Sequence, residues 1–104
     1  MAWQRGATRA RTPEWKALVR QARRELPLMC QATGRTEAQV KADGERLELD
    51  HIIPVAEGGT NTIGNLQWLS SSAHQAKTKA EWRRAMQRRR ARRHLPAKKH
   101  PGAA

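Results

Sequence analysis

The first clear pattern of apolar and polar positions lies between residues 12 and 27. Thr12 is a typical N-cap, Pro13 suits the first helical position, and Pro27 ends the segment. The pattern predicts an amphipathic helix that ends near residue 26. Its apolar face is formed by residues at intervals of three, four and seven: Trp15, Leu18, Val19, Ala22 and Leu26.

Alternation replaces helical spacing near the middle of the chain. Leu47 and Leu49 alternate with charged residues, which predicts a strand over 46–52 that ends before Pro54. The apolar residues within 66–69 predict a second short strand. Two short strands of this kind are typical of an antiparallel hairpin-like pair.

The segments beside these strands have weaker patterns. Gly34 and Gly44 indicate turns, and a short helix fits residues 37–41. The paired glycines within 57–62 predict a loop, because glycine adopts backbone angles that other residues resist.

A long helix is predicted at the C-terminal side. Serines 70–72 offer an N-cap, and Leu95-Pro96 ends the segment. We expect Trp82, like Trp68, to lie in the core rather than to stack on nucleic-acid bases. The expected inner face of the helix consists of small residues: Ala73, Ala76 and Ala80.

Composition adds a strong excess of positive charge. Lys and Arg number 21 against 9 Asp and Glu among 104 residues, a net charge of +12. No apolar run is long enough for a membrane span, and no signal peptide is recognisable, so we expect a soluble intracellular protein. The single cysteine, Cys30, excludes an intramolecular disulfide and a multi-cysteine zinc site. Cys30 is expected to be a buried small residue.

The charge is unevenly distributed along the chain. Residues 1–35 carry eight basic and two acidic side chains, and residues 77–104 carry eleven basic and one acidic. Residues 36–76 carry two basic and six acidic ones. Basic arms at both ends favour nucleic-acid binding through phosphates, although they could also be solubilising or bind anionic surfaces in general. The acidic middle is where carboxylates could hold a cation.

The candidate chemistry lies in that middle segment. A helix packed on two antiparallel strands brings the end of the first strand near the helix N-terminus, so Asp50 and His74 could each give one ligand to a divalent cation. His51 then stands beside the metal as a base for water. Because neighbouring strand residues point to opposite faces, both Asp50 and His51 can face one site only where the strand ends, twists or bulges.

Asp50-His51, Asn65 and His74 resemble the three motif positions of the HNH endonucleases, the ββα-metal nucleases, in the small form common in bacteriophage genomes. The resemblance is strongest over 47–78 and extends more loosely back to Leu28. It implies an α+β fold: a small ββα-metal (His-Me finger) nuclease module with an N-terminal helix and a long basic C-terminal helix.

The resemblance also implies a function and residue roles. The function is that of a metal-dependent DNA endonuclease that nicks or cuts both strands. His51 would be the general base, and Asp50 and His74 would hold one divalent ion, Mg²⁺ first, with Mn²⁺, Ni²⁺ or Zn²⁺ as alternatives. Asn65, counted with the catalytic residues, would pin the loop between the strands. The expected DNA contacts are Lys77, Arg83, Arg84, Arg88, Arg89 and Arg90.

One departure from the family pattern concerns a structural zinc. Many relatives carry two C-x-x-C pairs, whereas the corresponding positions here read Cys30-Gln-Ala-Thr33 and Ser70-Ser-Ser-Ala73. One remaining ligand cannot form that site, so we expect no structural zinc. Apolar packing should replace it, with these candidates: Leu28, Met29, Trp68 and Leu69.

We therefore expect a disordered basic arm over 1–11, a single HNH nuclease domain over 12–87, and a basic helix end and tail over 88–104. Double-stranded DNA is the expected partner, and the family context adds a phage terminase and the cytoplasm of a bacterial host. The alternative is a catalytically inactive or architectural basic DNA-binding protein of phage packaging.

Overall fold

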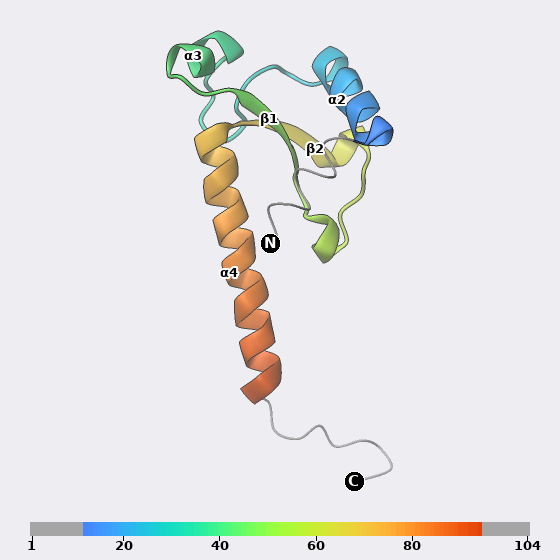
Figure 1. The fold of residues 1–104 in the computed structure, drawn as a ribbon, viewed down its shortest axis with the longest axis vertical. Coiled ribbons are helices and arrows are strands. Elements are labelled where there is room, and N and C mark those ends of the chain that lie inside the picture. Colours follow the sequence, from blue (N-terminus) through green and yellow to red (C-terminus); the bar gives the residue numbers. More distant parts are fainter. Residues whose placement is uncertain (1–11, 95–104) are drawn as a thin grey trace.

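The computed structural model describes residues 12–94, so the expected arm over 1–11 and the tail from residue 95 lie outside the described residues. Two strands form one antiparallel sheet, and three helices surround it (Figure 1). The elements in chain order are α2 (Pro13–Glu25), α3 (Glu37–Ala42), β1 (Leu47–His51), η1 (Val55–Glu57), η2 (Ile63–Asn65), β2 (Leu66–Ser70) and α4 (Ser71–His94).

The two shorter helices begin at side-chain caps. The Thr12 hydroxyl accepts a hydrogen bond from the Trp15 amide at 3.2 Å, which confirms the predicted start of α2. Thr36 and Gln39 form a reciprocal capping box at the start of α3. Both helices are close to their predicted bounds because each carries its own local start signal.

The sheet pairs β1 with β2 in a register that sets the site. Asp50 lies opposite Gln67, and His51 lies opposite Leu66. Strand β1 is one residue shorter at each end than the predicted 46–52. At its C-terminal end the Ile52 amide donates to the Asn65 carbonyl at 2.8 Å, and the chain there turns into the loop.

The main core lies between α2 and the sheet. Trp68 is 3% exposed, and its indole N–H donates to the Ala22 carbonyl at 3.3 Å, which confirms Trp68 as a core residue. A second small cluster contains Cys30, Val40 and Leu69. The buried residues of the main cluster are Ala22, Leu49, Leu66 and Trp68.

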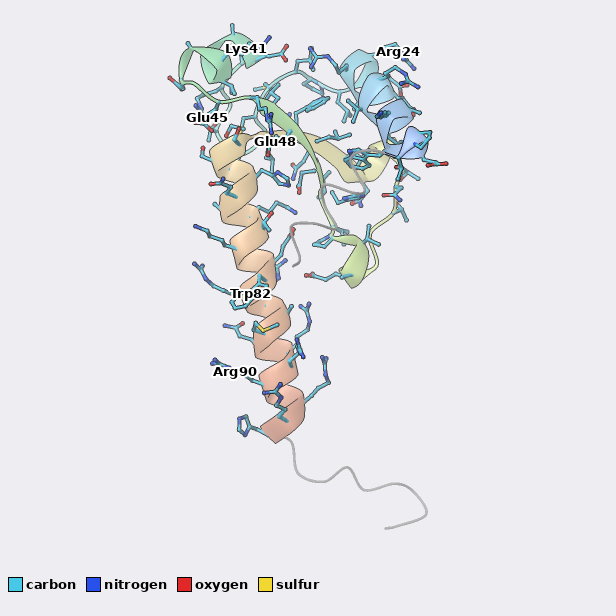
Figure 2. The ribbon with its side chains drawn as sticks, viewed as in Figure 1. Arg24, Lys41, Glu45, Glu48, Trp82 and Arg90 are labelled. Carbon is cyan, nitrogen blue, oxygen red and sulfur yellow. The ribbon has the colours of Figure 1, made fainter. Side chains whose placement is uncertain are left out.

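Helix α4 corrects two expectations. Ala76 is exposed, and Trp82 is 60% exposed (Figure 2), so the predicted packing of both residues was wrong. The helix meets the strands only with its first turns and then runs away from them, so the region around Trp82 has no sheet to pack against (Figure 1). None of the helices within residues 12–94 has the length and apolar character needed to cross a membrane.

The loop between the strands contains two short 3-10 helices, η1 and η2, where the sequence predicted only a loop. Gly59 lies close to the backbone of Ile53, at the start of this loop. A Cβ atom on Gly59 would be 1.7 Å from the Ile53 carbonyl oxygen and 2.8 Å from the Asn65 Nδ2 atom. The loop therefore requires glycine at position 59 for space.

We predict that Gly59→Ala destabilises the protein by about 1–3 kcal/mol, because the added methyl group must displace backbone. Gly64→Ala is the matched control, since a Cβ there meets no atom within 4 Å. Urea unfolding of both variants measures the difference. Equal stability of the two variants would contradict the close approach of Gly59 and Ile53.

Candidate active site

Asp50 is the most buried acidic side chain of the candidate site, with 6% of the residue exposed. Burial opposes its ionisation, but hydrogen bonds from His74, Gln67 and Lys77 outweigh burial and hold the pKa of Asp50 below its ordinary value. Gln67 Nε2 donates to Asp50 Oδ2 at 3.0 Å from the neighbouring strand. Asp50 is therefore a charged carboxylate inside the protein.

His74, in the first turn of α4, lies against this carboxylate. Its Nε2 atom is 3.5 Å from Asp50 Oδ1, and its Nδ1 atom is 2.7 Å from Glu48 Oε1. Glu48 and Asp50 lie two residues apart and therefore share one face of β1. Figure 2 shows Glu48 beside the first turns of α4. Hydrogen bonds with Asp50 first and with Glu48 next raise the pKa of His74 to about 9, against the effect of burial.

Glu48 was missed by the sequence reasoning, although strand alternation from Asp50 could have pointed to it. Once His74 has lost one proton, a carboxylate at Nδ1 keeps the remaining proton there and leaves the lone pair on Nε2. Glu48 therefore aims the Nε2 atom of His74 toward Asp50.

The donor set of Asp50 and His74 fits a small divalent cation. Two donors that each lie about 2.1 Å from an ion are about 3 Å apart at a right angle, close to the 3.5 Å between Asp50 Oδ1 and His74 Nε2. Within residues 12–94 no group of three or more His, Cys, Asp or Glu side chains is arranged to hold an ion. The protein thus offers two ligands, and His74 must lose its proton before Nε2 can serve as one.

Lys77 lies one turn after His74 and contacts the same carboxylate. Its Nζ atom is 3.1 Å from Asp50 Oδ2 and donates to the His51 carbonyl at 2.8 Å. Glu81 also pairs with this ammonium. Burial opposes the charge of Lys77, but Glu81 and Asp50 outweigh it and raise the pKa of Lys77. The Lys77 ammonium therefore neutralises part of the charge of Asp50.

His51 ends β1, and its ring lies on the other side of the strand from Asp50. The ring stacks on Trp15 of α2, with centroids 5.3 Å apart and an interplanar angle of 29°. Its Nε2 atom is 2.6 Å from the Asn61 Oδ1 atom. The structure brings His51 to the group around Asp50 through the backbone, by its carbonyl bond to Lys77.

Asn65 ends η2, directly before β2, and connects both parts of the loop. Its Oδ1 atom accepts from the Ile53 amide at 2.9 Å, and its Nδ2 atom donates to the Ile53 carbonyl at 3.0 Å and the Thr60 carbonyl at 2.9 Å. Asn65 is 9% exposed. The three bonds fix the path of the chain directly after His51.

The four positions expected to correspond to zinc ligands (30, 33, 70 and 73) lie close together, but their side chains do not form a set that could bind a metal. Cys30 is buried, and its Sγ–H donates to Ser70 Oγ at 3.5 Å. Ser70 Oγ also accepts from the Ala73 amide at 3.3 Å, as an N-cap of α4 does. Burial raises the pKa of Cys30, but hydrogen bonds with Ser70 and Thr33 outweigh burial and lower it to about 6. Packing and hydrogen bonds occupy this region.

The expected DNA contacts lie on α4 beyond the site. Arg84 and Arg88 pair with Glu57 of η1 at 3.3 and 3.7 Å, which ties the loop to the helix. Arg83, Arg89 and Arg90 are exposed and form no ion pair with any residue between 12 and 94.

Comparison with protein families places this geometry in context. The sequence profile described as HNH endonuclease matches residues 28–80, just over half of the chain. The chain belongs to the HNH endonuclease family. Neither the comparison with curated proteins nor that with solved structures gave a match. The HNH match contains β1, β2 and the first turns of α4, and it begins after α2.

Membership makes the chain an HNH-type protein of a nuclease family that generally uses a divalent metal and acts on DNA. The small α+β arrangement with a two-stranded antiparallel sheet fits a ββα HNH module. The roles of individual residues are a separate question, because function depends on the site and not on the fold alone.

We predict that chelation leaves this HNH fold intact. The region of Cys30 and Ser70 is held by packing, so EDTA should leave the helical circular dichroism signal unchanged, and metal analysis of the purified protein should find no tightly held zinc. A large loss of helical signal after EDTA would show that metal binding is coupled to folding and would contradict this account.

Proposed function

We propose that this HNH protein is a metal-dependent endonuclease that hydrolyses phosphodiester bonds of double-stranded DNA. The observation that carries the proposal is the pair formed by Asp50 and His74, whose donor atoms face each other at 3.5 Å. Glu48 aims the imidazole of that pair. Such a converging carboxylate and imidazole, built by β1 and α4, would supply two ligands to a divalent ion once His74 has lost its proton.

In the proposed reaction, His51 takes a proton from a water molecule at the end of β1, where its ring leaves the strand on the side opposite Asp50. The water oxygen bonds to phosphorus, and the bond from phosphorus to the 3′-oxygen breaks, leaving a 5′-phosphate and, after protonation from solvent, a 3′-hydroxyl. Asp50 and His74 would hold the divalent ion, Mg²⁺ first, with Mn²⁺, Ni²⁺ or Zn²⁺ as alternatives. When bound, that ion would neutralise charge that develops on the phosphoryl group and the leaving oxygen.

Lys77 changes partners in this proposal. Its ammonium contacts Asp50 in the absence of a divalent ion. A bound divalent ion would compete with this ammonium for the Asp50 carboxylate and release it. Lys77 then lies one helical turn from His74 and close enough to contact a DNA phosphate.

The basic half of α4 supports DNA as the substrate. Arg83, Arg89 and Arg90 are exposed cations on a helix that extends away from the site, and exposed cations of this kind bind phosphates without reading sequence. One observation favours the competing function, a catalytically inactive or architectural DNA-binding protein: Lys77 already neutralises Asp50. The nuclease assay below separates the two.

We predict that wild-type protein nicks supercoiled plasmid with Mg²⁺, Mn²⁺ or Ni²⁺ and that EDTA stops the reaction. His51→Ala should lower the rate at least about a hundredfold with metal and DNA binding retained, because His51 acts as a base and not as a ligand. Asp50→Ala should lose metal binding in calorimetry. His94→Ala is the matched control, since His94 is exposed and distant from the site in sequence.

Two results would overturn these assignments. Loss of metal binding in His51→Ala would make His51 a ligand. Absence of nicking by the wild type with each of the three metals, together with retained DNA binding, would favour the architectural protein.

A second prediction concerns the basic end of the chain. Removal of residues 88–104 removes five Arg and two Lys. It should weaken duplex binding and lower the slope of log affinity against log salt by up to about 6, because fewer counterions are released. Nicking at low salt should persist.

The control for the truncation is a double variant, Arg20→Gln with Arg24→Gln, on the exposed face of α2. It removes two positive charges from another surface and should change the slope little. An unchanged slope in the truncated protein would show that the C-terminal basic residues do not contact phosphates.

A further inference from the structure

His51 is held from two sides by residues to which nothing above assigns a function. Trp15 covers one face of the imidazole, with centroids 5.3 Å apart, and Asn61 Oδ1 lies 2.6 Å from Nε2. We propose that Trp15 and Asn61 are positioning residues, which hold the His51 ring in one orientation and one tautomer for proton transfer. This inference rests on the proposed role of His51.

The hydrogen bond determines which nitrogen is free. An amide oxygen can only accept, so a bond from Nε2 to Asn61 Oδ1 places the proton on Nε2 and leaves the lone pair on Nδ1. No residue between 12 and 94 hydrogen-bonds Nδ1 of His51. Every fully buried side-chain nitrogen or oxygen in that range has a partner, so Nδ1 lies where water reaches it, although the residue is 7% exposed.

The stacking contact determines the plane of the ring. A centroid distance of 5.3 Å with nearly parallel rings is within the favourable range for offset aromatic pairs. Trp15 also packs against the main core, so its indole is itself fixed. Rotation of the imidazole would break the hydrogen bond and the stack together.

One of the two residues comes from outside the segment matched by the HNH profile. Trp15 belongs to α2, which lies before the segment matched by the HNH profile, and Asn61 belongs to the loop. The loop is also fixed next to Asn61, because the carbonyl of the preceding residue, Thr60, accepts a hydrogen bond from Asn65. The His51 ring is therefore oriented by an added helix and by a pinned loop.

Nitrogen-15 NMR of the metal-free full chain at alkaline pH tests the inference without activity. We expect the Nε2–H tautomer of His51 and a protected Nε2 proton in the wild type and in Asn61→Asp, which keeps the acceptor oxygen. Asn61→Ala should lose the protected proton. The ring protons of His51 should keep their upfield shift in Trp15→Phe and lose it in Trp15→Leu. The Nδ1–H tautomer in the wild type would overturn the inference.

Plasmid nicking supplies the second readout. Asn61→Ala and Trp15→Leu should lower kcat about tenfold to a hundredfold with KM and metal affinity unchanged, and Asn61→Asp and Trp15→Phe should recover most of the rate. Leu18→Ala controls for lost core packing on α2, since Leu18 packs on the same core and has no ring to stack on His51. An equal loss of kcat in Leu18→Ala would overturn the role of Trp15.

The two readouts separate the inference from the proposed function. A wild-type protein that does not nick DNA contradicts the proposed endonuclease, whereas the tautomer and the ring-current shift still report whether Asn61 and Trp15 hold the imidazole. An active enzyme whose kcat is unaffected in Asn61→Ala overturns the inference alone.

Discussion

The charge of Asp50 is the constraint on which the rest of the site depends. A carboxylate that is 6% exposed must be paired, and three groups pair with it: the amide of Gln67, the imidazole of His74 and the ammonium of Lys77. Two of these come from α4, so the face of α4 that meets the sheet is polar. No residue of α4 from 71 to 94 is fully buried. The helix is therefore joined to the sheet partly by charge at Asp50, and under the proposed function a divalent ion would take the place of the Lys77 ammonium there.

A second consequence concerns the part of the module that relatives hold with zinc. Cys30 and Ser70 meet by a hydrogen bond, and Glu45 accepts from the Ser72 amide at 2.8 Å, which links the segment before β1 to the start of α4. Arg35 pairs with Glu45 nearby. Exposed ion pairs of this kind contribute little singly, so the buried cluster of Cys30, Val40 and Leu69 supplies most of the cohesion. A small apolar cluster thus packs this part of the module together.

The sequence predicted the elements that have local signals. Thr12 and Pro13 mark the start of α2, and alternation from Leu47 marks β1, because caps and periodicity are properties of a short segment. Trp82 was misplaced because its burial depends on whether the sheet is long enough to reach it, which no local pattern records. The stack of Trp15 on His51 joins residues 36 positions apart and could not be foreseen. The HNH family was recognisable because its motif residues have fixed order and spacing, whereas the contacts that orient them come from the tertiary fold.

Side chains alternate between the two faces of β1, and this explains why the module has one helix on each side of that short strand. Glu48 and Asp50 share the face of β1 that meets α4, and His51 follows directly, so its ring must leave on the opposite side. Support for that ring can come only from an element on the same side, and α2 is the element that packs there, through Trp15. The segment that resembles other HNH proteins begins after α2, yet the imidazole environment in this chain includes it. The surroundings of the His51 ring therefore begin at α2, before the first matched residue, because residues on opposite faces of β1 contact different elements.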